Sequence, residues 1–233
     1  IIIKYYVLKS YFYKYQFFWY NLYMNKKISS KQLARYPLYL KYLRKLQSEG
    51  QDTISSNVIA KEMKRSEESV RKDFQVISST SGKPKRGRDI SQLISDIERF
   101  LGYKTHDNAI IVGAGQLGSA IANYRGFENY GIEIVALFDT NPSIIGNSIK
   151  GKEIYSIEDM KEVVELHNVK TAILCVSKAS GQAACDIMIE SGIKGILNFT
   201  PVHLTVPDDI VVESLDVASL LSVVSQKLNP SSD

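Results

Sequence analysis

Apolar residues recur at steps of three and four along the first third of the chain. Between Ser30 and Gln47 this spacing predicts one amphipathic helix that ends before Gly50. Ser55 or Ser56 can cap a second helix, and the polar break at 64–66 precedes a third. The apolar positions of the first two helices are Leu33, Tyr36, Leu40, Leu43 and Leu46, then Val58, Ile59 and Met63. Two short helices joined by a tight turn indicate a helix-turn-helix unit.

The predicted third helix has an apolar face, formed by Val70, Phe74 and Ile77, and a polar, cationic face opposite. The basic segment Gly82–Arg88 follows, and its glycines predict an exposed turn between two short strands, where a wing would lie. The alternative is a solvated helix face beside a solvated loop. The two elements in this order favour binding to double-stranded DNA. The candidate DNA-binding residues are Ser69, Arg71, Lys72, Gln75, Lys83, Lys85 and Arg86.

The second half of the chain alternates short apolar runs with helical patterns. A helix over Ile90–Leu101 leads into it. The expected strands are Ala109–Val112, Ile132–Phe138, Thr171–Val176 and Gly195–Phe199, and the expected helices lie near 117–125, 157–167 and 180–191. This alternation predicts an α/β domain with a doubly wound parallel sheet, a Rossmann domain, behind the winged helix-turn-helix domain.

The first of these strands leads directly into Gly-x-Gly-x-x-Gly at Gly113–Gly118 and then a helix. In that context Gly113 permits a tight turn, Gly115 lets backbone amides approach a pyrophosphate, and Gly118 lets the helix pack on the strand. The next strand ends in Asp139, where a carboxylate can accept hydrogen bonds from ribose hydroxyls and repel a 2′-phosphate. The predicted ligand is therefore NAD(H). The alternative is a glycine turn that only packs, with an acid that only caps a loop.

Charge separates the two halves of the chain. Residues 1–105 carry 21 Lys and Arg against 9 Asp and Glu, whereas residues 106–233 carry 8 against 16. Only the first part is therefore suited to a polyanion. Cys175 and Cys185 form no metal-binding pattern, so we expect no metal site and a reducing cytoplasm. Eleven of the first 24 residues are aromatic, but Lys4, Lys9 and Lys14 interrupt any membrane-spanning run. We expect an upstream extension over 1–23, with Met24 as the natural start; a membrane-surface or partner-binding segment is the alternative.

Catalysis would require a proton donor or acceptor beside the nicotinamide. Of three histidines, only His203 follows a late strand, and no tyrosine after residue 108 has a lysine four residues later. We therefore expect a binding protein and not an enzyme. The alternative is an NAD-dependent oxidoreductase, or a nucleotide- or CoA-binding enzyme, with an appended basic domain.

Several stretches together resemble the Rex family of redox-sensing repressors. They are Arg35–Leu40, Ser69–Phe74, the Gly113–Gly118 fingerprint and Gly195–Pro201, within a resemblance that covers about residues 30–228. The resemblance implies a homodimer that binds an inverted-repeat operator, releases it when NADH binds, and so reports the NADH/NAD⁺ ratio. It also implies that Arg71 and Lys72 enter the major groove.

The resemblance further assigns the cofactor site and the domain plan. It implies that Phe199 lies beside the nicotinamide and that Asp139 binds the ribose. The pyrophosphate is expected at Gly113, Gly115, Gln116, Leu117 and Gly118, and Ala114 belongs to the same cofactor-binding turn. It also implies a dimer-forming helix over Val217–Leu228 that exchanges between subunits. The expected divisions are 1–23, 24–104 for the DNA-binding domain, 105–216 for the Rossmann domain, and 217–233 for the exchanged helix and tail. One departure is Arg88, which stands where family wings typically have tyrosine.

Overall fold

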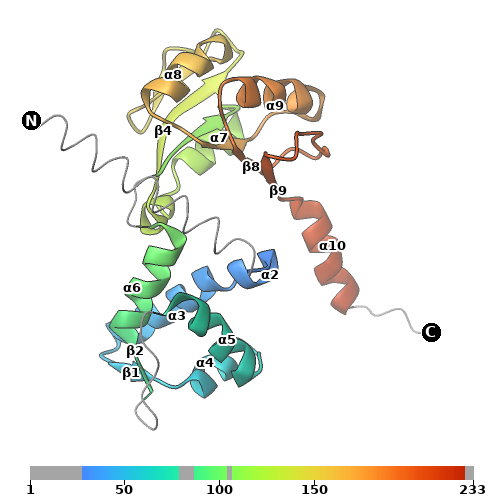
Figure 1. The fold of residues 1–233 in the computed structure, drawn as a ribbon. Coiled ribbons are helices and arrows are strands. Elements are labelled where there is room, and N and C mark those ends of the chain that lie inside the picture. The colour runs from blue at the N-terminus through green and yellow to red at the C-terminus, as the bar shows by residue number, and fades with distance from the viewer. Residues whose placement is uncertain (1–27, 79–86, 104–106, 229–233) are drawn as a thin grey trace, which may run out of the picture. The chain divides into compact units, whose positions relative to one another are not determined.

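A computed structural model describes residues 28–78, 87–103 and 107–228 of the chain, which divides into two units between Gly102 and Tyr103 (Figure 1). The division lies two residues before the expected boundary at 104. The predicted extension 1–23 and the wing residues Lys83, Lys85 and Arg86 lie outside the described residues. No helix in the described ranges is both long and apolar enough to cross a membrane.

The first unit combines helices that pack on one another with a two-stranded antiparallel sheet, which are the elements of a winged helix. Its elements are α2 (Ser30–Leu33), α3 (Tyr36–Ser48), β1 (Thr53–Ile54), α4 (Ser56–Glu62), α5 (Glu67–Ile77), β2 (Arg88–Asp89) and α6 (Ile90–Leu101). Strand β1 pairs with β2, so the chain returns from the wing segment alongside the strand that precedes α4. The helix expected at Ile90–Leu101 is confirmed to the residue.

The single helix expected over Ser30–Gln47 is wrong, because the structure has two helices separated by a turn at Ala34 and Arg35. Pro37 lies in the first turn of α3, and its missing N–H cannot donate the hydrogen bond that a continuous helix needs. Leu33 is consequently 47% exposed, while Leu40 and Leu43 are buried as expected.

The two helices of the helix-turn-helix begin at serine caps. Ser55 accepts a hydrogen bond from the amide of Val58 and Ser66 accepts one from the amide of Ser69, so of the two predicted caps for α4 Ser55 is the one used. The predicted apolar face of α5 is confirmed, with Val70, Phe74 and Ile77 all buried. Val58, in contrast, is 44% exposed, because this short helix buries the adjacent Ile59 and Ala60 instead.

The second unit is built on a seven-stranded sheet of order β5-β6-β4-β3-β7-β8-β9, parallel except for the β5–β6 hairpin. The strands are β3 (Asp107–Val112), β4 (Ile132–Asp139), β5 (Ser148–Ile149), β6 (Lys152–Ser156), β7 (Thr171–Leu174), β8 (Gly195–Asn198) and β9 (Val211–Ser214). The α-helices are α7 (Gln116–Ala122), α8 (Met160–Leu166), α9 (Gly181–Glu190) and α10 (Val217–Leu228), with short 3-10 turns at 127–130, 157–159 and 178–180. The four predicted strands are present; β5, β6 and β9 were not expected.

Two apolar layers enclose this sheet. Alternate residues of the central strands, such as Val112 and Leu174, pack with α8 and α9, while Ile111, Leu137 and Ile173 form the second layer with Ala122 of α7. Helices therefore cover both faces, as expected for a doubly wound sheet. Helix α10 has the predicted bounds but buries none of its residues in the chain.

Candidate nucleotide-binding and DNA-binding sites

The glycine fingerprint forms a tight turn between β3 and α7. Gly113 has a φ of +98°, and a Cβ there would lie 2.6 Å from the carbonyl oxygen of Cys175. A Cβ on Gly118 would lie 1.8 Å from the carbonyl oxygen of Gly113. Gly115 is different, because no atom lies within 4 Å of the position its Cβ would take. The fold therefore requires glycine at 113 and 118, whereas at 115 glycine keeps space open beside the turn.

Asp139 ties the end of β4 to this turn. Its Oδ2 accepts a hydrogen bond of 2.8 Å from the backbone N–H of Ala114, and its Oδ1 accepts from the amides of Thr140 and Asn141 at 2.8 and 2.9 Å. A carboxylate offers about four acceptor positions. Asp139 can therefore still accept a hydrogen bond from a ligand hydroxyl while it holds the glycine turn in place.

A cleft of about 570 Å³ opens at the carboxyl ends of β3, β4 and β7. It lies where the chain order of the sheet reverses, the position at which open α/β sheets bind ligands. Its lining comprises Val112, Gly113, Gly115, Phe138, Asp139, Thr140, Ile157, Cys175, Val176, Ser177, Ala179, Ser180, Ala183, Ala184 and Ile187. Of the predicted cofactor residues, Gly113, Gly115 and Asp139 line this cleft. Ala114, Gln116, Leu117 and Gly118 belong to the same turn and the start of α7 but do not line it.

Phe199 also lies outside the lining. It follows β8, is half-buried, and packs against the apolar layer that contains Ile111 and Ile173. Sequence reasoning missed the segment 175–180 and the first turns of α9, which form one wall of the cleft. The position of this segment in the chain could have indicated its role, because it follows β7 and β7 pairs directly with β3.

Few groups in this cleft can exchange a proton near neutral pH. The described residues that line it include no His, Lys or Tyr, and its only acid is Asp139. Burial raises the pKa of the Cys175 thiol to about 11, so this thiol stays protonated at pH 7. His203 is exposed on the loop after β8 and does not line the cleft.

Helix α5 presents the predicted DNA-binding residues on its outer side. Arg71, Lys72 and Gln75 are exposed and Ser69 is half-buried. Two ion pairs span one helical turn each, Arg71–Glu67 at 2.5 Å and Lys72–Glu68 at 2.7 Å. The Glu68 carboxylate raises the pKa of Lys72. Such exposed pairs contribute little to stability, so a DNA phosphate can replace the carboxylates as partner.

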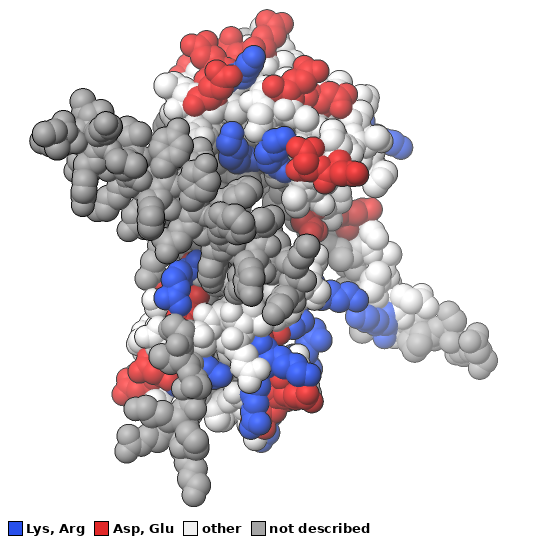
Figure 2. Space-filling model, in the orientation of Figure 1, with Lys and Arg blue, Asp and Glu red and all other residues white. Residues whose placement is uncertain are grey.

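The charge asymmetry of the sequence is visible on the surface. On the face shown in Figure 2, acidic side chains predominate on the unit that begins at Tyr103, whereas Lys and Arg lie beside acidic residues on the first unit.

At the return from the wing segment, Gly87 has a φ of +75°, and a Cβ there would lie 2.8 Å from the carbonyl oxygen of Ile54. The described end of the wing therefore passes close against β1.

Two family models match the chain, one in each half of the sequence. Residues 27–75 match the family described as putative DNA-binding protein N-terminus, and residues 104–202 match the CoA binding domain family. The redox-sensing transcriptional repressor Rex of Clostridium beijerinckii is 35% identical over 207 residues, covering 89% of this chain and 98% of the relative. This chain belongs to the Rex family.

Solved structures of a Rex-family repressor, RSP, resemble the chain along most of its length. RSP in complex with β-NAD⁺ and operator DNA is 33% identical with a TM-score of 0.82, covering 87% of this chain and 93% of RSP. RSP in complex with β-NADH is 32% identical with a TM-score of 0.78, covering 87% and 95%. The predicted fold class, a winged helix-turn-helix domain followed by a Rossmann domain, is confirmed.

Arg88 lies in β2, at the end of the segment that is predicted to form the wing. Its guanidinium donates a hydrogen bond of 3.2 Å to the hydroxyl of Ser78 and lies 5.7 Å from the ring centroid of Phe74. Burial lowers the pKa of Arg88, and the Asp96 carboxylate opposes that shift. Arg88, at the position where the family resemblance leads us to expect tyrosine, therefore attaches β2 to the end of α5.

Proposed function

We propose that this chain is a transcriptional repressor that senses the NADH/NAD⁺ ratio. As a homodimer it binds an inverted-repeat operator in double-stranded DNA and releases it when NADH binds. The observation that carries the proposal is the combination of two features in a chain of the Rex family. The α5 face has exposed cationic side chains, and a cleft lies at the switch point of a parallel sheet. The RSP structures with operator DNA and with NADH support it.

The proposed ligand is NAD(H), with the pyrophosphate beside Gly113, Gly115 and the start of α7. Asp139 receives the adenosine ribose and repels a 2′-phosphate, which favours NAD(H) over NADP(H). The nicotinamide extends along the wall formed by residues 175–180, toward Phe199. Because the cleft offers Asp139 and a protonated Cys175 as its titratable groups, we propose that the chain binds the dinucleotide without transforming it.

The proposed dimer contact is α10, the first part of the segment 217–233. Its side chains include Leu220, Leu221 and Val224, which are 57%, 66% and 53% exposed. Three such residues on one helix need a partner surface in water. That partner is a second copy of the chain, and the two copies exchange this helix. The proposed location of the dimer is the cytoplasm.

Linkage provides the decisive test, because a ligand that lowers affinity for DNA must bind more weakly to the DNA complex by the same factor. Fluorescence titration should give a lower NADH affinity for the protein saturated with the RSP operator duplex than for the free protein. The expected factor lies at the low end of about 5–150-fold, since Arg88 replaces the family tyrosine.

Two control ligands complete the titration. NAD⁺ should show a much smaller difference, and coenzyme A should compete weakly with NADH if the site prefers a dinucleotide. Equal NADH affinity with and without saturating operator would refute the proposed sensing function. If the protein binds neither the operator nor the DNA upstream of its own gene, the proposed repressor function is refuted as well.

A further inference from the structure

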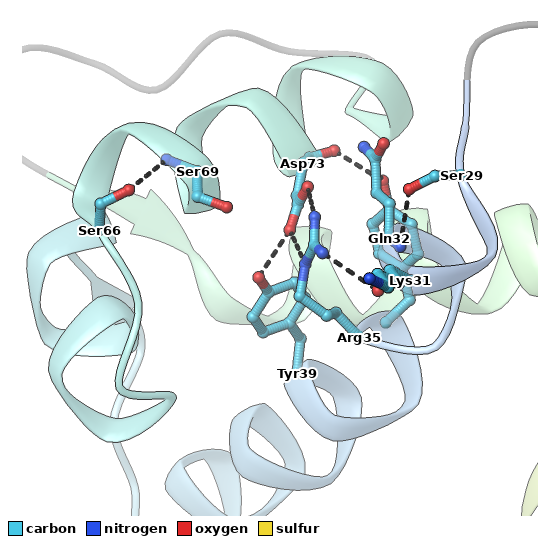
Figure 3. Close-up of polar contacts among 9 residues, drawn as sticks. Ser29, Lys31, Gln32, Arg35, Tyr39, Ser66, Ser69 and Asp73 are labelled. Atoms are coloured by element: carbon cyan, nitrogen blue, oxygen red, sulfur yellow. Dashed lines mark hydrogen bonds and ion pairs between the residues drawn. The ribbon is translucent and has the colours of Figure 1, made fainter.

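Two stretches of the first unit carry the resemblance to the Rex family, Arg35–Leu40 and Ser69–Phe74, and they meet at one buried carboxylate. Asp73, on α5, is 2% exposed. Arg35, 38 residues earlier, donates from Nε to Oδ2 at 2.7 Å and from Nη2 to Oδ1 at 2.6 Å. The hydroxyl of Tyr39 donates to Oδ2 at 2.7 Å (Figure 3). We call these three residues the Asp73 cluster.

The Asp73 cluster joins α5 to both helices at the start of the unit. Arg35 lies in the turn between α2 and α3 and donates from Nη1 to the carbonyl oxygen of Lys31 at 3.0 Å. Tyr36 donates its hydroxyl to the backbone carbonyl of Asp73 at 2.9 Å. The break between α2 and α3 therefore places an arginine where it can grip the recognition helix with two parallel hydrogen bonds.

These contacts differ in kind from the apolar part of the α5 interface. Val70, Phe74 and Ile77 are buried by apolar contacts, which are not directional and tolerate small rotations of the helix about its axis. A two-pronged guanidinium–carboxylate pair is directional, so it restricts that rotation. Because the phenol ring of Tyr39 also packs on Phe74, 5.2 Å between centroids, removing its hydroxyl leaves the apolar packing in place.

The direction of α5 matters because candidate DNA contacts adjoin the cluster. Asp73 follows Lys72 in sequence and lies one helical turn from Ser69. Arg35 and Asp73 line the same surface pocket of about 320 Å³ as Ser69 and Lys72. Turning α5 about its axis would move both of these side chains relative to a DNA groove.

We propose that Arg35, Tyr39 and Asp73 are positioning residues for operator recognition, which set the rotation of α5 without contacting DNA. This inference rests on the proposed repressor function. It predicts that changes in the Asp73 cluster reduce specific binding to the operator but leave binding to unrelated DNA, which depends on phosphate charge, unaltered.

The main variants remove the directional hydrogen bonds of the Asp73 cluster and disturb the surrounding packing as little as possible. Arg35→Lys keeps the positive charge but loses the two-pronged geometry, and the double variant Arg35→Gln/Asp73→Asn removes both charges so that neither is left buried alone. Tyr39→Phe removes a single hydroxyl donor. Arg44→Lys is the matched control, since Arg44 pairs with Glu98 between α3 and α6 and not with α5.

Arg35→Lys should weaken operator binding about tenfold or more, a loss of about 1.4 kcal/mol, with NADH affinity unaltered. Binding to unrelated DNA and the slope of log affinity against log salt should stay at the parent values in the double variant. Arg44→Lys should bind the operator as the parent does. Circular dichroism at the assay temperature checks that each variant is folded, and Tyr39→Phe, which should also weaken operator binding selectively, serves if the charge variants unfold.

The outcomes separate this inference from the function on which it rests. A parent protein that fails to bind the operator counts against the proposed function. If the parent binds, operator affinity equal to the parent's in Arg35→Lys and Tyr39→Phe overturns the positioning role. If the slope of log affinity against log salt is smaller in magnitude by about 0.9 in the double variant, Arg35 contacts a phosphate directly. That result would also overturn the positioning role.

Discussion

Replacing Gly115 by alanine should separate cofactor binding from folding. Gly115 has a φ of −66° and a ψ of −162°, which alanine also adopts, and its Cβ would meet no atom within 4 Å. Alanine lowers the entropy of the unfolded chain, a gain of about 0.4–1 kcal/mol. It is a poorer N-cap than glycine for α7, a cost of similar size. The free energy of unfolding should therefore change by less than about 1 kcal/mol.

The same substitution should weaken NADH binding. Gly115 lines the cleft, and under the proposed function the pyrophosphate approaches its backbone closely. A methyl group placed there takes space from the ligand. We expect a loss of about tenfold or more in NADH affinity, which corresponds to about 1.4 kcal/mol.

Gly118→Ala is the matched comparison, because its effect should be on folding. The new Cβ would lie 1.8 Å from the carbonyl oxygen of Gly113 and 3.3 Å from Cγ2 of Ile111. Relief requires α7 to move more than an ångström away from β3, which should cost about 1–3 kcal/mol of stability or more. Such a shift would also distort the turn that Asp139 holds through Ala114.

Thermal denaturation followed by circular dichroism and isothermal titration with NADH would measure both quantities on each variant. Unaltered NADH affinity in a folded Gly115→Ala protein would refute the close approach of the pyrophosphate. Unaltered stability of Gly118→Ala would refute the tight packing of α7 against β3.

Three further predictions address other parts of the chain. Lys72→Ala should lower operator affinity by about 1–3 kcal/mol if the side chain reads a base edge, with NADH binding intact, and an unchanged gel-shift midpoint would remove it from the interface. Asp139→Ala should weaken NADH binding and narrow the preference over NADPH, because the ribose acceptor and its charge are both lost; titration giving the parent's two affinities would contradict this. The pKa of the Cys175 thiol, raised by burial from 9.0 to about 11, predicts slow alkylation by iodoacetamide at pH 8, and bound NADH should slow it further. Because this pKa is raised in the folded state, the thiol's contribution to stability is complete below pH 9 and is lost as the pH rises toward 11. Mass spectrometry of the two cysteine-containing peptides measures the labelling, and rapid modification of Cys175 at pH 8 would be inconsistent with its burial.

Local sequence determined those elements whose ends are set by neighbouring residues. Helix α6 has the predicted bounds because Asp89 caps its first turn and Gly102, with a φ of +75°, ends it. The turn at Gly113–Gly118 was likewise predictable, since the strand before it and the helix after it are both apparent in the sequence. These features depend on contacts within about one helical turn or one hairpin, which a linear pattern contains.

Contacts between distant segments were decided only by the tertiary structure. Nothing near Asp73 in the sequence shows that it is buried, because its partner Arg35 lies 38 residues away and reaches it only through the break between α2 and α3. The wall of the cleft at residues 175–180 joins the glycine turn only because β7 pairs with β3 in the sheet. The exposure of Leu33 and Val58 is set by which neighbours arrive to cover them. A periodic pattern shows which residues share a face, whereas the fold determines what that face meets.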